Sequence, residues 1–172
     1  PAIVFDRCFM KLIIQEFEPQ YTAAVIDLIL AIQVDEFGVA ICRDDQPDLL
    51  HIPDYYQASG GQFWLAFINE ELVGCVSLKV FAHAQAALRK MFVAKSLRGN
   101  PDIKLAQQLY EILVAFAKDA NYQEIWLDTP LVAHAAHKFY EKNGFEITAN
   151  ANVPENYKLP VGFEMKIYKK NI

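Results

Sequence analysis

A strand, a loop, a long helix and a second strand are predicted in succession over residues 86–129, and this order constrains the fold more than any other feature. Residues 103–120 carry apolar side chains at intervals of three and four, which is typical of an amphipathic helix. Residues 86–93 and 124–129, on either side, are the predicted strands. If both strands lie in one sheet, their connection is a right-handed parallel crossover, and ligands favour the carboxyl ends of such strands.

The remaining segments predict a mixed α/β fold. Further strands are predicted over residues 11–17, 62–68, 72–81, 145–149 and 163–169, and further helices over residues 21–37, 48–59 and 131–143. Three strands in series followed by alternating helices and strands indicate a mixed sheet with helices on both faces. Residues 11–172 form one predicted domain, and residues 1–10 are interpreted as a leader or tag-like segment.

Charge and cysteine content argue against several classes of protein. A net charge of −5 is unsuited to nucleic acid, which needs a basic face. Cys8, Cys42 and Cys75 are an odd number without C-x-x-C spacing, which favours a reduced, cytoplasmic setting over a disulfide scaffold or a zinc site. No apolar run approaches the roughly 18 residues of a membrane span. We therefore expect no metal, membrane or nucleic-acid partner, and a homodimer remains open.

The residues before the long predicted helix have the character of an anion site. Arg98-Gly99 leads into the helix, and Lys95 and Lys104 add positive charge nearby. A helix start offers unpaired backbone N–H groups and the positive end of the helix dipole. This pattern predicts a pyrophosphate or another phosphorylated group, and the alternative is a surface loop with solvated basic side chains.

Residues 136–145, Ala-His-Lys-Phe-Tyr-Glu-Lys-Asn-Gly-Phe, resemble the A-x-x-[LF]-Y-E-K-x-G-F signature of the Gcn5-related N-acetyltransferase (GNAT) superfamily. Residues 88–93, Arg98-Gly99 and residues 125–129 strengthen this resemblance, which covers roughly residues 12–168. It implies a GNAT-like fold whose central, mostly antiparallel sheet of six to seven strands is splayed between the fourth and fifth strands, residues 86–93 and 124–129.

The resemblance also implies an enzyme that moves an acetyl group from acetyl-coenzyme A to a primary amine of a small molecule by direct attack. Tyr140 would protonate the departing thiolate, and a backbone N–H of the fourth strand would steady the thioester oxygen. From the residues alone, an aromatic packed on a helix face is the favoured interpretation of Tyr140. The positions implied for coenzyme A are Met91, Phe92, Val93, Arg98, Gly99, Lys104, Ala106 and Tyr140.

Three positions depart from the family pattern. The loop over residues 98–106 is longer than R-G-x-G-x-G or Q-x-x-G-x-A, and Lys104 and Ala106 replace its later glycines. Ala87 stands where many relatives carry a glutamate base, and Ala133 stands where they often carry asparagine. These departures leave a second interpretation, a catalytically weak or inactive coenzyme A or ligand-binding module of the same fold.

Other polar residues are candidates for the acceptor side. Tyr55 and Tyr56 lie in a polar and aromatic stretch that covers the acceptor in relatives, and Asp128 ends the fifth strand. The alternatives are a solvated loop for the tyrosines and helix capping for Asp128. His134 and His137 are three residues apart but have no evident third metal ligand, so we expect solvated surface histidines.

Overall fold

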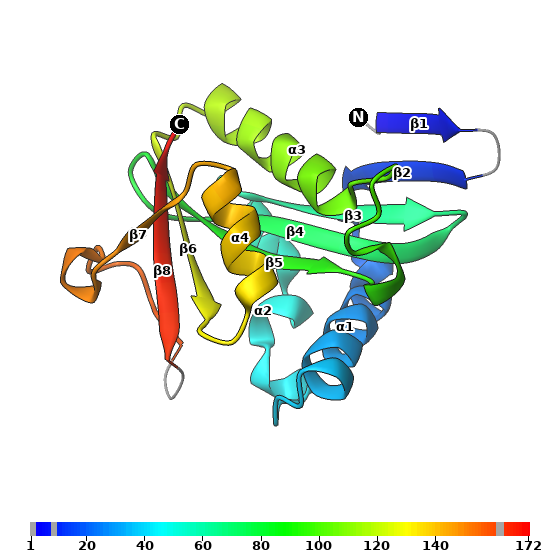
Figure 1. Ribbon diagram of the computed structural model, residues 1–172, viewed down its shortest axis with the longest axis horizontal. Coiled ribbons are helices and arrows are strands. Elements are labelled where there is room, and N and C mark those ends of the chain that lie inside the picture. The colour runs from blue at the N-terminus through cyan, green and yellow to red at the C-terminus, as the bar shows by residue number, and fades with distance from the viewer. Residues whose placement is uncertain (1–2, 8–9, 161–163) are drawn as a thin grey trace.

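The computed structural model describes residues 3–7, 10–160 and 164–172, and within them eight strands form one sheet. The strands are β1 (Ile3–Arg7), β2 (Met10–Glu16), β3 (Gln62–Ile68), β4 (Glu71–Ala82), β5 (Gln85–Val93), β6 (Glu124–Pro130), β7 (Glu146–Thr148) and β8 (Met165–Asn171). The α-helices are α1 (Thr22–Leu30), α2 (Pro47–Leu50), α3 (Leu105–Asp119) and α4 (His134–Lys142). The elements therefore follow the predicted order, although Phe163, the expected start of the last strand, lies outside the described residues (Figure 1).

The strand order is β1-β2-β3-β4-β5-β6-β8-β7, and β5–β6 is the one parallel pair between the described strands. The expected mixed, mostly antiparallel sheet is thus confirmed. The strand beyond the expected six to seven is β1, which comes from the segment expected as a leader. Ile3–Arg7 pairs with β2 at one edge of the sheet. Residues 1–2 and 8–9 of that segment lie outside the described residues.

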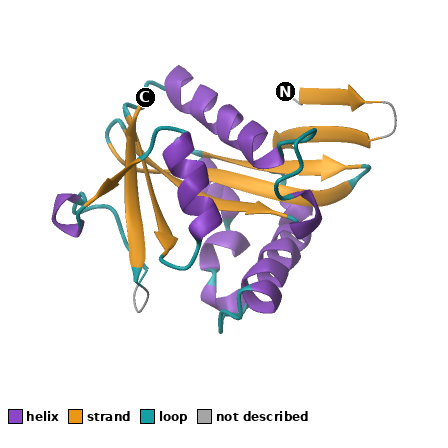
Figure 2. Ribbon diagram, in the orientation of Figure 1, coloured by secondary structure: helices purple, strands orange, loops and turns teal. Residues whose placement is uncertain are grey.

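Helices cover both faces of the sheet, as expected (Figure 2). The alternation of side chains along β3 shows why, since successive residues of a strand point to opposite faces. Phe63 and Leu65 pack with residues of α1 and α2, whereas Trp64 and Ala66 pack with residues of α3. Among the described helices, none has the length and apolar character that crossing a bilayer requires.

The two parallel strands stay together over only three residue pairs. Gln85, Ala86 and Ala87 of β5 face Glu124, Ile125 and Trp126 of β6. Beyond them no further pairing joins these strands in the described part of the chain, and Figure 1 shows β5 and β6 diverging. The predicted splay is confirmed. Backbone groups past the last pair need other partners, which a ligand between the strands can supply.

A β-bulge in β5 lies next to this parting. The register between β4 and β5 shifts between Cys75 and Ser77, and Lys90 has a left-handed φ of 51°. The Ser77 hydroxyl donates to the Arg89 carbonyl at 3.0 Å, and the Cys75 thiol donates to the Lys90 carbonyl at 3.2 Å. Burial raises the pKa of the Cys75 thiol to about 12, so the thiol keeps its proton. Both carbonyls of the bulge are therefore satisfied from β4.

We expect Ser77→Ala to destabilise the fold because it leaves the Arg89 carbonyl without its donor beside a side chain that is fully buried. An unsatisfied buried acceptor costs about 1–3 kcal/mol, and urea unfolding measures this loss. Ser96→Ala, at an exposed serine, is the matched control and should change the free energy of unfolding by no more than about 0.5 kcal/mol. Equal losses in the two variants would contradict the role of Ser77 in holding the bulge.

Candidate active site

One carboxylate joins both sides of the gap between β5 and β6. Asp128 Oδ1 lies 2.7 Å from Arg89 Nη1 and accepts a hydrogen bond from the Tyr157 hydroxyl at 2.6 Å. The Arg89 guanidinium lies over the Tyr157 ring, 4.8 Å from its centroid. The Asp128 side chain is 4% exposed, so this group of three is almost enclosed. Helix capping, the predicted alternative role of Asp128, is wrong, because Ala133 occupies the N-cap of α4 and α4 has no side-chain cap.

Lys90, which follows Arg89 in the bulge, makes a similar ion pair with Asp48 of α2. Asp48 Oδ2 accepts from the Tyr56 hydroxyl at 2.5 Å and lies 3.2 Å from Lys90 Nζ. Lys90 also donates to Gln46 Oε1 at 2.9 Å. Burial first, and the charge of Asp48 second, raise the pKa of Tyr56. Tyr56 is thus buried and bonded, whereas its predicted companion Tyr55 is 41% exposed.

Tyr140 lies on α4 and packs against Tyr168 of β8, the strand beside β6. Its ring is 7% exposed and packs against the rings of Phe139, Phe145 and Tyr168. The Tyr140 hydroxyl has no hydrogen-bond partner among the described residues. Its oxygen is not among the fully buried polar atoms of those residues that lack a partner. Burial, and secondly the negative charge of Asp128, raise the pKa of this hydroxyl. The Tyr140 phenol therefore keeps its proton at neutral pH.

The start of α3 offers backbone donors. Asn100 Oδ1 accepts from the amides of Asp102 and Ile103 at 3.0 Å each, which fixes the loop before the helix. Lys104 then has a left-handed φ of 48°, and α3 begins at Leu105. The amides of Leu105, Ala106 and Gln107 find no acceptor within the described parts of the chain. This geometry suits an anion.

The end of β5 and the start of α3, which are two predicted parts of the coenzyme A site, lie side by side. A Cβ added to Gly74 of β4 would lie 3.1 Å from the Phe92 carbonyl and 3.2 Å from Leu105 Cδ2. Met91 and Phe92 are half-buried on opposite faces of the sheet, and Val93 is buried. The structure therefore brings Met91–Val93 close to the first turn of α3, the turn that contains Ala106.

Arg98 is engaged elsewhere. Its Nε donates to the Val93 carbonyl at 2.8 Å, and its guanidinium binds both oxygens of Glu36 at 2.7 and 3.1 Å. Glu36 ends a π-helical turn, Ala31–Glu36, that follows α1. Arg98 thus ties the end of β5 to the helical segment on the opposite face. Gly99 has a φ of 69° with no atom near its missing side chain, so its backbone conformation is what requires glycine.

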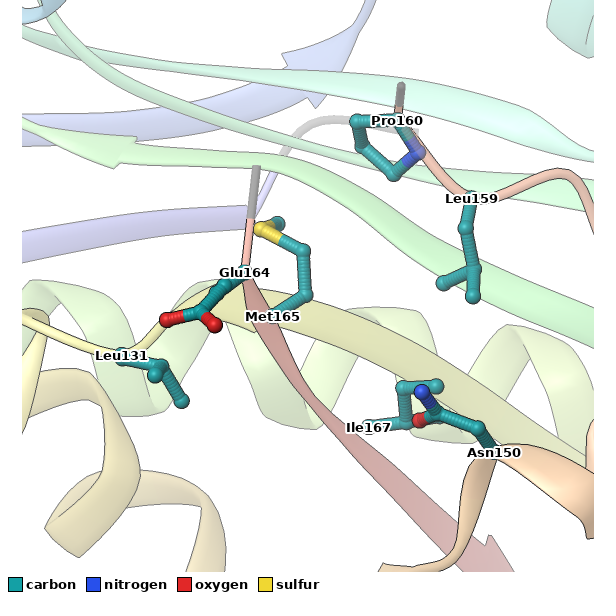
Figure 3. A pocket seen from close by; sticks show the side chains of 7 residues that line it. All are labelled: Leu131, Asn150, Leu159, Pro160, Glu164, Met165 and Ile167. Atoms are coloured by element: carbon teal, nitrogen blue, oxygen red, sulfur yellow. The ribbon is translucent and has the colours of Figure 1, made fainter. Parts of the chain in front are cut away.

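A hollow of about 340 Å³ lies beside the carboxyl end of β6 (Figure 3). Its lining residues are Leu131, Asn150, Leu159, Pro160, Glu164, Met165 and Ile167. The connection that carries Leu159 is held to β5, because Arg89 Nη2 donates to the Lys158 carbonyl at 3.1 Å. Ile167, one of its lining residues, pairs with Asp128 between β6 and β8.

Sequence reasoning named some members of this site and missed their partners. The sequence pattern gave no role to the side chains of Arg89, Asp48 and Tyr157, because their roles depend on contacts with distant segments. The expectation of two solvated histidines is wrong for His137, which is 4% exposed, with Nε2 lying 2.9 Å from the Pro130 carbonyl. His134 is exposed as expected. Within the described ranges no three acidic, histidine or cysteine residues gather as a metal site.

The fold is that of an acetyltransferase of the GNAT class. Residues 26–145 match the model of the acetyltransferase (GNAT) family, and the chain belongs to that family. An acetyltransferase of this family from Staphylococcus aureus is 35% identical, with a TM-score of 0.86 over 93% of this chain and 98% of that one. An acetyltransferase from Streptococcus agalactiae is 34% identical, with a TM-score of 0.88 over 96% of this chain and all of its own.

Similarity extends to two further proteins. The N-acetylaspartate synthetase of Danio rerio is 33% identical over 115 residues, which are 66% of this chain and 39% of that protein. This chain therefore matches well under half of that relative's length. The PaiA N-acetyltransferase of Thermoplasma acidophilum, solved in complex with coenzyme A, is 16% identical with a TM-score of 0.72 over 94% of this chain and 99% of its own. It supports the fold alone.

We expect Lys104→Gly to be more stable than Lys104→Ala by about 1 kcal/mol, because a left-handed φ strains every residue with a Cβ. Chemical unfolding of the two variants measures the difference. Ala115→Gly, at an exposed position inside α3, is the control and should be destabilising by about 1 kcal/mol. If alanine were the more stable residue at both positions, Lys104 would not be strained.

Proposed function

We propose that this protein is an N-acetyltransferase that moves an acetyl group from acetyl-coenzyme A to a primary amine of a small molecule. The observation that carries the proposal is the parting of β5 and β6 after three residue pairs, together with a Tyr140 hydroxyl that has no hydrogen-bond partner among the described residues. Membership of the GNAT family, whose members use acetyl-coenzyme A, supports it. Holding the donor and the amine in one gap supplies much of the rate acceleration.

The residues present fit coenzyme A at both ends of the gap. The free amides of Leu105, Ala106 and Gln107, with Lys104 before them, suit the pyrophosphate. The backbone of Met91–Val93, beyond the last pair with β6, suits the pantetheine arm. Acetyl-coenzyme A, when bound, supplies the acetyl group as an activated thioester.

Tyr140 is assigned the role of general acid. Its hydroxyl keeps its proton at neutral pH because burial and the charge of Asp128 raise its pKa. A phenol held in this state can give its proton to the leaving sulfur as the carbon–sulfur bond breaks. The ring is fixed by packing against Phe145 and Tyr168, so the proton is delivered at a defined place.

The acceptor side favours a small polar amine. Arg89 and Lys90 place two cations there, and Asp128 and Asp48 place two carboxylates. Such a balanced lining suits a molecule that carries an amine together with other polar groups. The name of the similar N-acetylaspartate synthetases contains an acetylated amino acid, which makes amino acids the first acceptors to test.

Tyr140→Phe should lower turnover by about tenfold or more, within the range for loss of a general acid, and leave the affinity for acetyl-coenzyme A nearly unchanged. Thiol release measures turnover. Tyr168→Phe is the control, since its ring packs beside Tyr140 but its hydroxyl donates to Glu141. Because the pKa of Tyr140 is raised, this residue should cause no alkaline loss of rate below about pH 10.

Two outcomes would change the assignment. Unchanged turnover in Tyr140→Phe removes Tyr140 from the mechanism. Binding of acetyl-coenzyme A by the wild-type protein in calorimetry, without thiol release across a broad panel of amines, supports instead the non-catalytic module of the same fold. No binding at all removes both functions.

Arg98 is expected to contribute to the pyrophosphate site after exchanging its carboxylate partner for phosphate. Arg98→Ala should then weaken acetyl-coenzyme A binding by about tenfold, or about 1.4 kcal/mol. Glu36→Gln removes the charge that holds the guanidinium and should not weaken binding. Calorimetric titration measures both affinities. Equal weakening in the two variants would show that Arg98 acts by holding the π-helical turn rather than by contacting phosphate.

A further inference from the structure

Lys79 of β4 is a half-buried cation without a carboxylate partner. In the described part of the chain, no aspartate or glutamate forms an ion pair with it. The two cations of the neighbouring strand differ, because Arg89 pairs with Asp128 and Lys90 pairs with Asp48. A charge that is partly removed from water costs free energy unless it is paired, so Lys79 points to an anion that binds there.

Lys79 lies on the face of the sheet that carries the Arg89–Asp128 pair. It pairs with Ala87 of β5, and the side chains of two paired residues point to the same face. Arg89 follows Ala87 by two residues and therefore points to this face as well. Ala87 packs in one cluster with Tyr157, the tyrosine that donates to Asp128. The unpaired cation thus shares a face with the groups of the acceptor side.

Tyr55 meets Lys79 from the π-helical turn Pro53–Gln57. The Lys79 ammonium donates a hydrogen bond to the Tyr55 backbone carbonyl and lies 5.3 Å from the centroid of the Tyr55 ring. An ammonium group has three N–H donors, so two of them have no partner among the described residues. The Tyr55 side chain is 41% exposed, and a ligand can therefore reach this pair from solvent.

The charges around Lys79 also favour an anionic ligand. Burial lowers the pKa of Lys79, and the charge of Asp48 raises it only in part. Asp48 is already bound to Lys90, so it does not serve as the partner of Lys79. After burial, the charges that act on the Tyr56 hydroxyl are Asp48 and Arg89, which shows that these groups surround one region. An anion bound at Lys79 would offset the lost hydration of the ammonium group.

We propose that Lys79 binds a carboxylate of the acceptor, so that the preferred acceptors are amino acids rather than simple amines. This inference rests on the proposed acetyltransferase function. The two open N–H groups of Lys79 can hold a carboxylate through charge-assisted hydrogen bonds. An acceptor without an acidic group leaves the charge of Lys79 uncompensated, and the site discriminates against it. Lys79 thus determines specificity and takes no part in the transfer of the proton or the acetyl group.

The wild-type protein gives the first test. Each common amino acid is compared with its α-carboxamide, and aspartate and glutamate are also compared with asparagine and glutamine. The two members of each pair differ in one negative charge and hardly in size. Thiol release gives kcat/KM, expressed per concentration of free amine. We expect the acid of a preferred pair to exceed its amide by about tenfold or more, as for the loss of one charge-assisted contact.

Lys79→Met then removes the charge and keeps an unbranched apolar side chain beside the Tyr55 ring. KM for the acid should rise about tenfold or more while kcat changes little, because the lost contact holds ground state and transition state alike. The kinetics of the amide should stay close to wild type, so the preference disappears. Lys79→Arg keeps the charge and should retain most of the preference. Lys118→Met, at an exposed lysine of α3, is the matched control.

Each result decides the proposal. Loss of the preference in Lys79→Met, absent from Lys118→Met, supports it. Equal kcat/KM for acids and amides in the wild type overturns it, and so does an equal loss for both in Lys79→Met, which leaves Lys79 a structural partner of the Tyr55 carbonyl. If Lys79→Met does not fold, Lys79→Gln takes its place. Turnover of amines without any preference keeps the proposed function, whereas no turnover of any amine or amino acid removes both.

Discussion

The parting of β5 and β6 is the constraint on which the rest of the site depends. Three residue pairs hold the strands together, and the backbone beyond them must find other partners. A right-handed crossover through α3 brings the start of that helix to the open side, so free amides and open strand edges meet in one place. A ligand with a charged end and an extended polar arm satisfies both sets of groups at once.

Contacts from outside the two strands keep this gap open and polar. Ser77 and Cys75 of β4 donate hydrogen bonds to the bulge carbonyls, while the side chains of Arg89 and Lys90 pair with Asp128 and Asp48. Arg89 then spans the gap to Asp128. Breaking such a nearly enclosed ion pair from one side leaves an uncompensated charge, which costs about 3–5 kcal/mol in buried cases. The pair therefore joins β5 to β6 beyond their last residue pair.

The sequence allowed the order of elements, the splayed sheet and the position of Tyr140 to be predicted, because these depend on local periodicity and on one continuous signature. The partners of Asp128 were not predictable, because Arg89 and Tyr157 meet it only through long-range packing. The burial of His137 was missed for the same reason. Its hydrogen bond to the Pro130 carbonyl follows from the close return of α4 onto the end of β6, which spacing along the helix does not reveal.

Two departures from the family pattern, Lys104 and Ala87, can be explained by backbone conformation and contacts in the structure. Lys104 occupies a left-handed position that glycine adopts without strain, at a cost of about 1–2 kcal/mol, and in return it adds a positive charge where the amides of α3 are open. Ala87 of β5 packs in one cluster with Trp126 and Tyr157. The same Tyr157 bonds Asp128 and so holds a carboxylate at the gap from the opposite strand. One side chain, Tyr157, therefore packs beside Ala87 and also holds Asp128.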